Sequence, residues 1–222
     1  MTGPLPIGPL RTGDGPAVQA DGVSCGPSVL VVTAALTGAG WPGAVGPRFA
    51  AAQALAHRQA NRVWPRALGT TPWGMRAWLR RHAPAAGRYR VRRWTGELPS
   101  EITAAVADGR PVPLLVGSAS LPRHWVLVTG LDGAHGPDHA GGRDGATGPG
   151  RDRGDGRAGG EAPARGDRSG SSTTGSDGRP AWRVYDPAAG RVRVLRPDDL
   201  LTGNATRAVS WPRPWAALLP VR

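Results

Sequence analysis

The chain has 222 residues, a single cysteine and a formal net charge of +12 that comes from arginine alone, because it contains no lysine. One cysteine excludes an internal disulfide framework, and no apolar run reaches the roughly 18 residues that a membrane-spanning helix needs. Residues 1–16 also lack the continuous apolar core of a signal peptide, so we expect a cytoplasmic protein without a membrane span.

The composition changes sharply in the second half of the chain. Residues 134–180 contain no Val, Ile, Leu, Met or aromatic residue, so we expect a disordered insert rich in Gly, Arg and Asp. Residues 1–18, broken by prolines, are expected to be an extended lead-in, and residues 19–222 one domain that the insert interrupts. The excess arginines outside the insert are scattered, so we expect no nucleic-acid partner.

Helices are expected in the first half of the chain, from capping residues and apolar spacing. Their expected ranges are 27–36, 47–61, 71–82 and 99–109. Pro27 suits the first turn of its helix, and Thr71 and Ser100 are the expected N-caps of the last two. Gln53, His57 and Asn61 follow at intervals of four, so they are expected to share a polar face of the second helix.

Strands follow, each short and rich in Val. Their expected ranges are 111–118, 123–131, 181–187 and 190–196. A short helix is expected at 197–203, and the proline-rich tail is expected to pack Trp211 and Trp215 against the domain. Helices that precede antiparallel strands predict the α+β class.

Cys25 lies where a polar turn meets an apolar run of helical length, in QADGVSCGPSVLVV. The start of a helix presents unpaired backbone N–H groups and the positive end of the helix dipole. Both favour the thiolate, which is the reactive form of cysteine. Cys25 is therefore a candidate nucleophile; the alternative is an inert cysteine in the core.

A thiolate nucleophile needs a base and a group that orients it. His124 opens an expected strand directly after a polar turn, and Asp186 ends another in VYDP. If the two strands pair, the carboxylate lies beside the imidazole; the alternatives are a surface histidine and a turn-forming aspartate. The backbone N–H of Cys25 and the side-chain amide of Gln19 are candidate donors to an oxyanion.

These segments, in this order, resemble the papain-like cysteine peptidases, and within them the stand-alone relatives of the bacteriocin-processing peptidases that cleave double-glycine leaders. The matching text is QADGVSCGPSVL, GTTPWGMRAWL, LPSEITAAVADGRPVPLLV, RHWVLVTGLDG and VYDPAAGRVRVL. The resemblance implies a papain-like fold, with N-terminal helices on a C-terminal antiparallel sheet. It also implies Cys25 as nucleophile, His124 as base and acid, Asp186 as orienter and Gln19 as oxyanion donor.

The expected function is a thiol-dependent peptidase that acts on a peptide or protein substrate. The same residues would also serve an acyltransferase of transglutaminase or ligase type, and a papain-like domain that binds peptides without catalysis is a third possibility. Neither a metal nor a cofactor is expected, because a single cysteine and scattered histidines do not form a zinc pattern. The insert follows the strand of His124, so we expect it beside the site.

Overall fold

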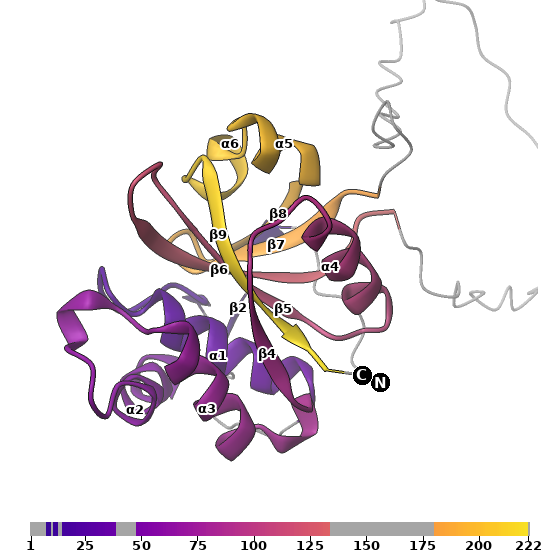
Figure 1. Ribbon diagram of the computed structural model, residues 1–222. Helices are drawn as coiled ribbons and strands as arrows, with labels where there is room; N and C mark the ends of the chain where they lie inside the picture. The colour runs from indigo at the N-terminus through magenta and orange to yellow at the C-terminus, as the bar shows by residue number, and fades with distance from the viewer. Residues whose placement is uncertain (1–7, 10, 13–14, 39–47, 134–179, 222) are drawn as a thin grey trace, which may run out of the picture. The chain divides into compact units, whose positions relative to one another are not determined.

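The computed structural model describes residues 8–9, 11–12, 15–38, 48–133 and 180–221 (Figure 1). The expected insert, apart from Pro180, and much of the expected lead-in lie outside the described residues. The helices are α1 Cys25–Leu36, α2 Phe49–Ala60, α3 Pro72–His82, α4 Leu98–Ala107, α5 Pro197–Thr202 and α6 Thr206–Val209, with single 3₁₀ turns at Arg66–Leu68 and Pro84–Ala86. The strands are β1 Gly8–Pro9, β2 Arg11–Thr12, β3 Gly15–Pro16, β4 Tyr89–Arg93, β5 Val112–Gly117, β6 Pro122–Leu131, β7 Trp182–Asp186, β8 Arg191–Leu195 and β9 Arg213–Pro220.

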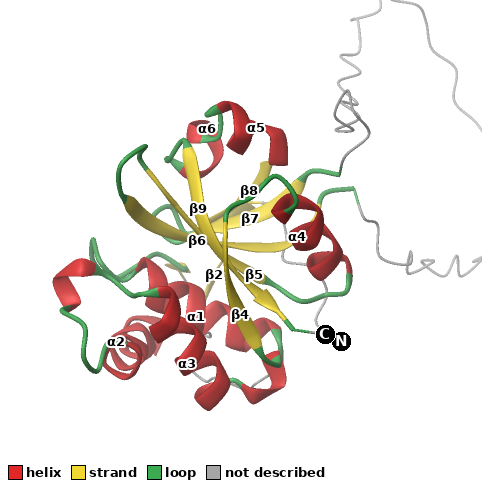
Figure 2. Cartoon of the chain, viewed as in Figure 1, coloured by secondary structure: helices red, strands yellow, loops and turns green. Residues whose placement is uncertain are grey.

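One seven-stranded antiparallel sheet organises the described residues, in the order β1-β8-β7-β6-β5-β9-β4 (Figure 2). Strands β2 and β3 form a separate two-stranded pair. Helices and an antiparallel sheet together make the α+β class that the sequence predicts. The element order differs from the expected one at three strands: β1 precedes α1, β4 precedes α4, and β9 follows α5 and α6.

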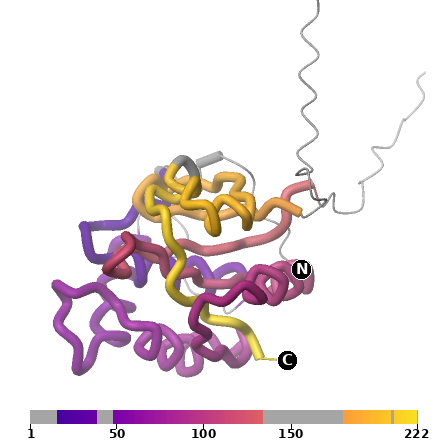
Figure 3. Tube along the Cα trace, turned by 45° about the horizontal axis from the view of Figure 1, so that its top comes forward, coloured from indigo at the N-terminus to yellow at the C-terminus, as the bar shows by residue number. Residues whose placement is uncertain are grey.

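Side chains on the two faces of the sheet build two separate cores, as alternation along a strand requires. One core joins α1, α2 and α3 to Trp125, Leu127 and Tyr185. The other joins α4, α5 and α6 to Val126, Val128 and Val184. Figure 1 shows α1–α3 below the sheet and α5 and α6 above it, and in the turned view of Figure 3 the purple helical segments lie opposite the orange C-terminal ones. The sheet is therefore buried on both faces.

Three strands of the sheet, β1, β4 and β9, were not expected as strands. Strand β9 occupies part of the proline-rich tail, for which no strand was expected, and it lies between β5 and β4. Pro214 sits where the β5–β9 register shifts, and at such an irregularity a residue without an N–H does little harm. Strand β4 carries the arginines of YRVRR, and two of them, Arg90 and Arg92, pair with Glu101 of α4.

Several helix details also differ from the expectation. Helix α1 begins at Cys25 instead of Pro27. Helix α4 begins at Leu98, so Ser100 lies inside its first turn and is not its N-cap, whereas Thr71 does cap α3 by accepting the N–H of Gly74. The polar face of α2 turns inward: Gln53 and His57 are only 1% and 2% exposed. None of the helices in the described ranges is long and apolar enough to cross a membrane.

Candidate active site

Cys25 is the first residue of α1, and its position follows from the turn before it. Ser24 closes that turn, because its Oγ accepts the Asp21 N–H at 2.9 Å and its carbonyl accepts the Ser28 N–H. The side chain of Asp21 accepts the Val23 N–H at 3.1 Å. Among the described residues, the backbone N–H of Cys25 has no acceptor. The thiol is 4% exposed, so it sits at the unpaired N-terminal end of a buried helix.

His124 and Asp186 meet at one end of two neighbouring strands. His124 lies near the start of β6 and Asp186 is the last residue of β7, which pairs with β6 in the antiparallel sense. The ring Nε2 lies 2.8 Å from Oδ1 of the carboxylate, and both side chains are almost fully buried. The same Oδ1 accepts the N–H of Ala188 at 3.0 Å. The turn after β7 thus holds the carboxylate that orients the ring.

The Cys25 thiol is a second hydrogen-bond partner of the imidazole. Nε2 faces Asp186, which leaves Nδ1 for the hydrogen bond between the ring and Cys25. Burial lowers the pKa of His124, but the hydrogen bonds to Asp186 and Cys25 and the negative charges of both outweigh it and raise the pKa to about 9. The ring is therefore protonated at neutral pH, and an imidazolium is the counter-ion that stabilises a thiolate. The structure brings the three predicted residues together in the order sulfur, imidazole, carboxylate.

Gln19 lies between the two turns that carry the site. Its backbone N–H donates to the carbonyl of Pro187 at 2.8 Å, next to Asp186. Its side-chain Nε2 donates to the carbonyl of Asp21 at 2.8 Å, in the turn that leads into Cys25. Tyr185 adds a further link, because its hydroxyl donates to Ala17 at 2.6 Å. These hydrogen bonds hold Gln19 near the turns that carry Asp186 and Cys25. Its role as an oxyanion donor stays a prediction.

Thr70 and Trp125 pack against the start of α1, a contact that the sequence did not reveal. Trp125 is buried in the core, and its Nε1 donates to the carbonyl of Thr70 at 2.9 Å. A Cβ on Gly26 would lie 2.8 Å from Thr70 Cβ and 3.3 Å from Trp125 Cδ1. The backbone directly after Cys25 therefore packs against both side chains. The GTTPWG segment offered no spacing from which this contact could be predicted.

The insert, expected beside the site, lies outside the described residues, but the strand ends that flank it are described. His124 lies near the start of β6, whereas the insert leaves after the strand ends at Leu131. The seven residue steps from His124 to Leu131 span roughly 24 Å, because a strand rises about 3.4 Å per residue. The chain returns at Pro180, and Ala181 accepts the Asp132 N–H at 2.8 Å at the same end of the strands. The described residues on either side of the insert thus lie at the end of the strands opposite the imidazole.

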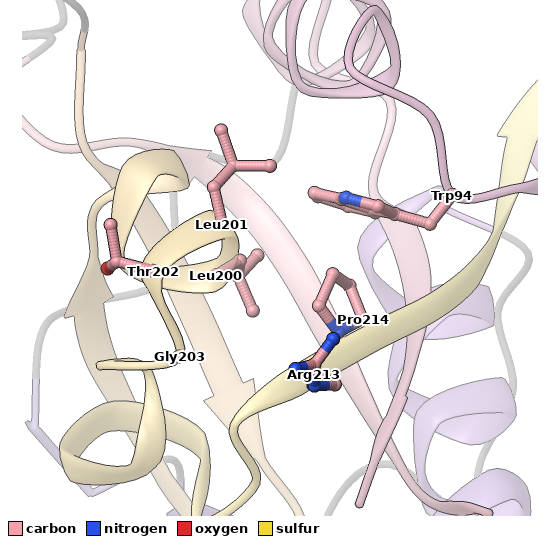
Figure 4. A pocket seen from close by; sticks show the side chains of 7 residues that line it. All are labelled: Trp94, Leu200, Leu201, Thr202, Gly203, Arg213 and Pro214. Carbon is pink, nitrogen blue, oxygen red and sulfur yellow. The ribbon is translucent and has the colours of Figure 1, made fainter. Parts of the chain in front are cut away.

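Neither of two described cavities is lined by the predicted site residues. One, of about 290 Å³, lies between α5 and β9, where Trp94 and Leu201 stand on opposite sides (Figure 4). Its Pro214 is paired with Val116, which is paired with His124, so this cavity lies two strands from the imidazole. The other, of about 600 Å³, lies between α4 and the end of β9. Within the described ranges, no three His, Cys, Asp or Glu side chains gather as a metal site.

The sequence was compared with protein-family models and with curated proteins. The chain matches no protein-family model, and a search of curated proteins found no match.

Proposed function

We propose that this protein is a cysteine peptidase of papain-like fold, with Cys25, His124 and Asp186 as its catalytic residues. The observation that carries the proposal is the buried contact of His124 Nε2 with Asp186 at 2.8 Å, together with a hydrogen bond between the same ring and the sole cysteine. Placing the thiol at the N-terminus of α1, against a sheet that supplies the other two residues, is also what the papain-like resemblance implies.

The reaction proceeds in two steps. The Cys25 thiolate attacks the carbonyl carbon of a peptide bond, and the oxygen becomes negative. Its donors are the backbone N–H of Cys25, which is free among the described residues, and the amide of Gln19. Protonated His124 then gives its proton to the leaving amine, the C–N bond breaks, and a thioester remains on Cys25. Neutral His124 next takes a proton from water, and the resulting hydroxide releases the acid and restores the thiolate.

Each part of the site has an expected share of the rate. Proton transfer by a positioned group contributes about 10²–10⁴-fold, and one oxyanion donor contributes about 10²–10³-fold. Asp186 acts through the ring: it keeps Nε2 occupied, so that Nδ1 faces the sulfur, and it holds the proton on His124 until the amine leaves. This division of work involves no metal or cofactor.

The first test uses the fact that Cys25 is the only cysteine, so that any thiol adduct forms there. We would measure the rate of alkylation by chloroacetamide against pH, for the folded protein and for the protein in urea. We expect the folded midpoint to lie below that of the urea-unfolded chain, because an imidazolium and a helix N-terminus both favour a thiolate. Coincident midpoints would overturn the proposal.

The second test is turnover of a library of fluorogenic peptide amides. Turnover should be lost in Cys25→Ala and should fall by at least about 10²-fold in His124→Ala. Asp108→Ala is a suitable control, since it removes a carboxylate from the exposed Asp108–Arg110 ion pair and leaves the site intact. Addition of a primary amine, with mass spectrometry of the products, separates hydrolysis from acyl transfer: a new amide would identify an acyltransferase.

A further inference from the structure

Gln53 of α2 is a buried amide that binds the backbone on both sides of Gln19. Its Oε1 accepts the N–H of Ala20 at 2.8 Å, and its Nε2 donates to the carbonyl of Val18 at 3.1 Å. The same Oε1 accepts the hydroxyl of Ser28 at 2.9 Å, in the first turn of α1. The residue is 1% exposed. One side chain thus joins the segment of Gln19 to the helix that begins with Cys25.

We propose that Gln53 is a positioning residue of the oxyanion site, which sets the Gln19 amide relative to the Cys25 N–H. This inference rests on the proposed function, because it assigns Gln53 to a site that only an acyl-transferring thiol needs. Gln53 makes no described contact with Cys25, His124 or Asp186. Its effect is therefore confined to the donors and leaves the activation of the thiol unchanged.

The need for an amide at this position follows from the backbone that it serves. Residues 17–20 lie between β3 and the turn before α1 and belong to no helix or strand. Their backbone polar groups cannot pair within a helix or sheet, so partners elsewhere hold the segment in place; the bonds that Gln53 makes to Ala20 and Val18 are partly buried. An apolar side chain would fill the space between α1 and α2 equally well but would leave the Ala20 N–H and the Val18 carbonyl unpaired. The segment would then relax, and the Gln19 amide would move with it.

Two reactions of Cys25 separate positioning of the oxyanion donors from activation of the thiol. Chloroacetamide reacts at a saturated carbon: the C–S bond forms as chloride leaves, and no oxyanion arises. With p-nitrophenyl acetate the thiolate adds to the carbonyl, an oxyanion forms, and p-nitrophenolate leaves. The ratio of the two rate constants cancels the fraction of thiolate. It therefore reports the oxyanion site without knowledge of the natural substrate.

For Gln53→Ala in the full chain we expect acylation by p-nitrophenyl acetate to fall at least about tenfold, within the about 10²–10³-fold that one donor supplies. Alkylation by chloroacetamide and its pH midpoint should stay within about twofold of the wild-type values. Gln53→Glu keeps an acceptor for Ala20 and Ser28, so it should recover part of the acylation rate and also serves if the alanine variant fails to fold. Combined with Gln19→Ala, Gln53→Ala should add little further loss, because both act on one donor.

Gln59→Ala is the matched control. Gln59 lies on the same helix and accepts a hydrogen bond from Trp78 Nε1 at 2.9 Å, on the side that faces α3. It should leave the ratio of the two rates unchanged. Parallel loss of both reactions in Gln53→Ala, or no loss of either, would overturn the inference and leave the peptidase proposal standing. An ordinary alkylation midpoint in the wild-type protein would instead refute the peptidase proposal itself.

Discussion

Replacing Asp186 by alanine tests how a buried carboxylate controls the charge of His124. The substitution removes the acceptor that lies 2.8 Å from Nε2, together with the negative charge. Ala188, whose N–H donates to the same oxygen, loses that partner too. Asp186→Asn is the graded companion, because it removes the charge and keeps an oxygen that can accept from the ring.

The size of the effect follows from the surroundings of the ring. Burial lowers the pKa of His124, yet the pKa stands at about 9 against an ordinary 6.5, since four favourable interactions outweigh burial. Two of the four come from Asp186, and its hydrogen bond is the largest of them. Removing them should lower the pKa of His124 by about one unit or more, which corresponds to about 1 kcal/mol or more. For Asp186→Asn we expect a smaller decrease.

The assay is an NMR titration of the imidazole nitrogens from pH 5 to 10, with the His124 signals identified from the spectrum of His124→Gln. The wild-type midpoint should lie near 9, and that of Asp186→Ala near 8 or below. The variant should accordingly be mostly deprotonated at pH 9, where the wild-type ring is half protonated. Asp108→Ala, an exposed carboxylate paired with Arg110, should leave the midpoint in place. An unchanged midpoint in Asp186→Ala would refute the assigned role of the carboxylate.

Three further changes test a close contact after Cys25, the pH dependence of stability, and the effect of the insert on Cys25. Gly26→Ala should destabilise the fold by about 1–3 kcal/mol in urea unfolding, because its Cβ would meet Thr70 at 2.8 Å; Gly22→Ala, with nothing within 4 Å, is the control that should cost less. Burial and the charge of Arg66 lower the pKa of His57 although Asp21 raises it, so the unfolded chain binds the proton more readily and stability falls as the pH drops below 6.5. His57→Leu should reduce that loss between pH 7 and 5, and equal losses would contradict it. Replacing residues 134–179 by a short turn should leave the alkylation midpoint of Cys25 unchanged; a shift would show that the insert acts on the site.

The candidate site was predictable because each of its residues ends or begins an element. A lone cysteine at a helix start, a histidine at a strand start and an aspartate before proline at a strand end are local signals, and two adjacent strands suffice to bring the last two together. Helix α1 begins two residues earlier than expected, so Cys25 itself occupies the first helical position.

The supporting residues were not predictable for a physical reason. The pattern of α2 gives Gln53 and His57 a common face, and a polar face ordinarily meets solvent. In the structure that face meets a backbone segment that belongs to no helix or strand. The Ala20 N–H and the Val18 carbonyl of this segment pair with the Gln53 amide, which an apolar side chain could not do. Strand β9 was missed for a similar reason: local proline content favours a loop, and only its neighbours β5 and β4 supply the hydrogen bonds that make it a strand.

The register of β6 and β7, rather than the chain between them, sets the distance from His124 to Asp186. Leu127 is paired with Tyr185, so the side chains of His124 and Asp186 lie just beyond that pair, at the same end of the ladder. At the other end, the Asp132 N–H donates to Ala181 and closes the ladder before the insert departs. The entropic cost of closing a loop between two paired strands rises only slowly with the length of the loop. A long insert at this point therefore costs the fold little and leaves the imidazole and carboxylate in register.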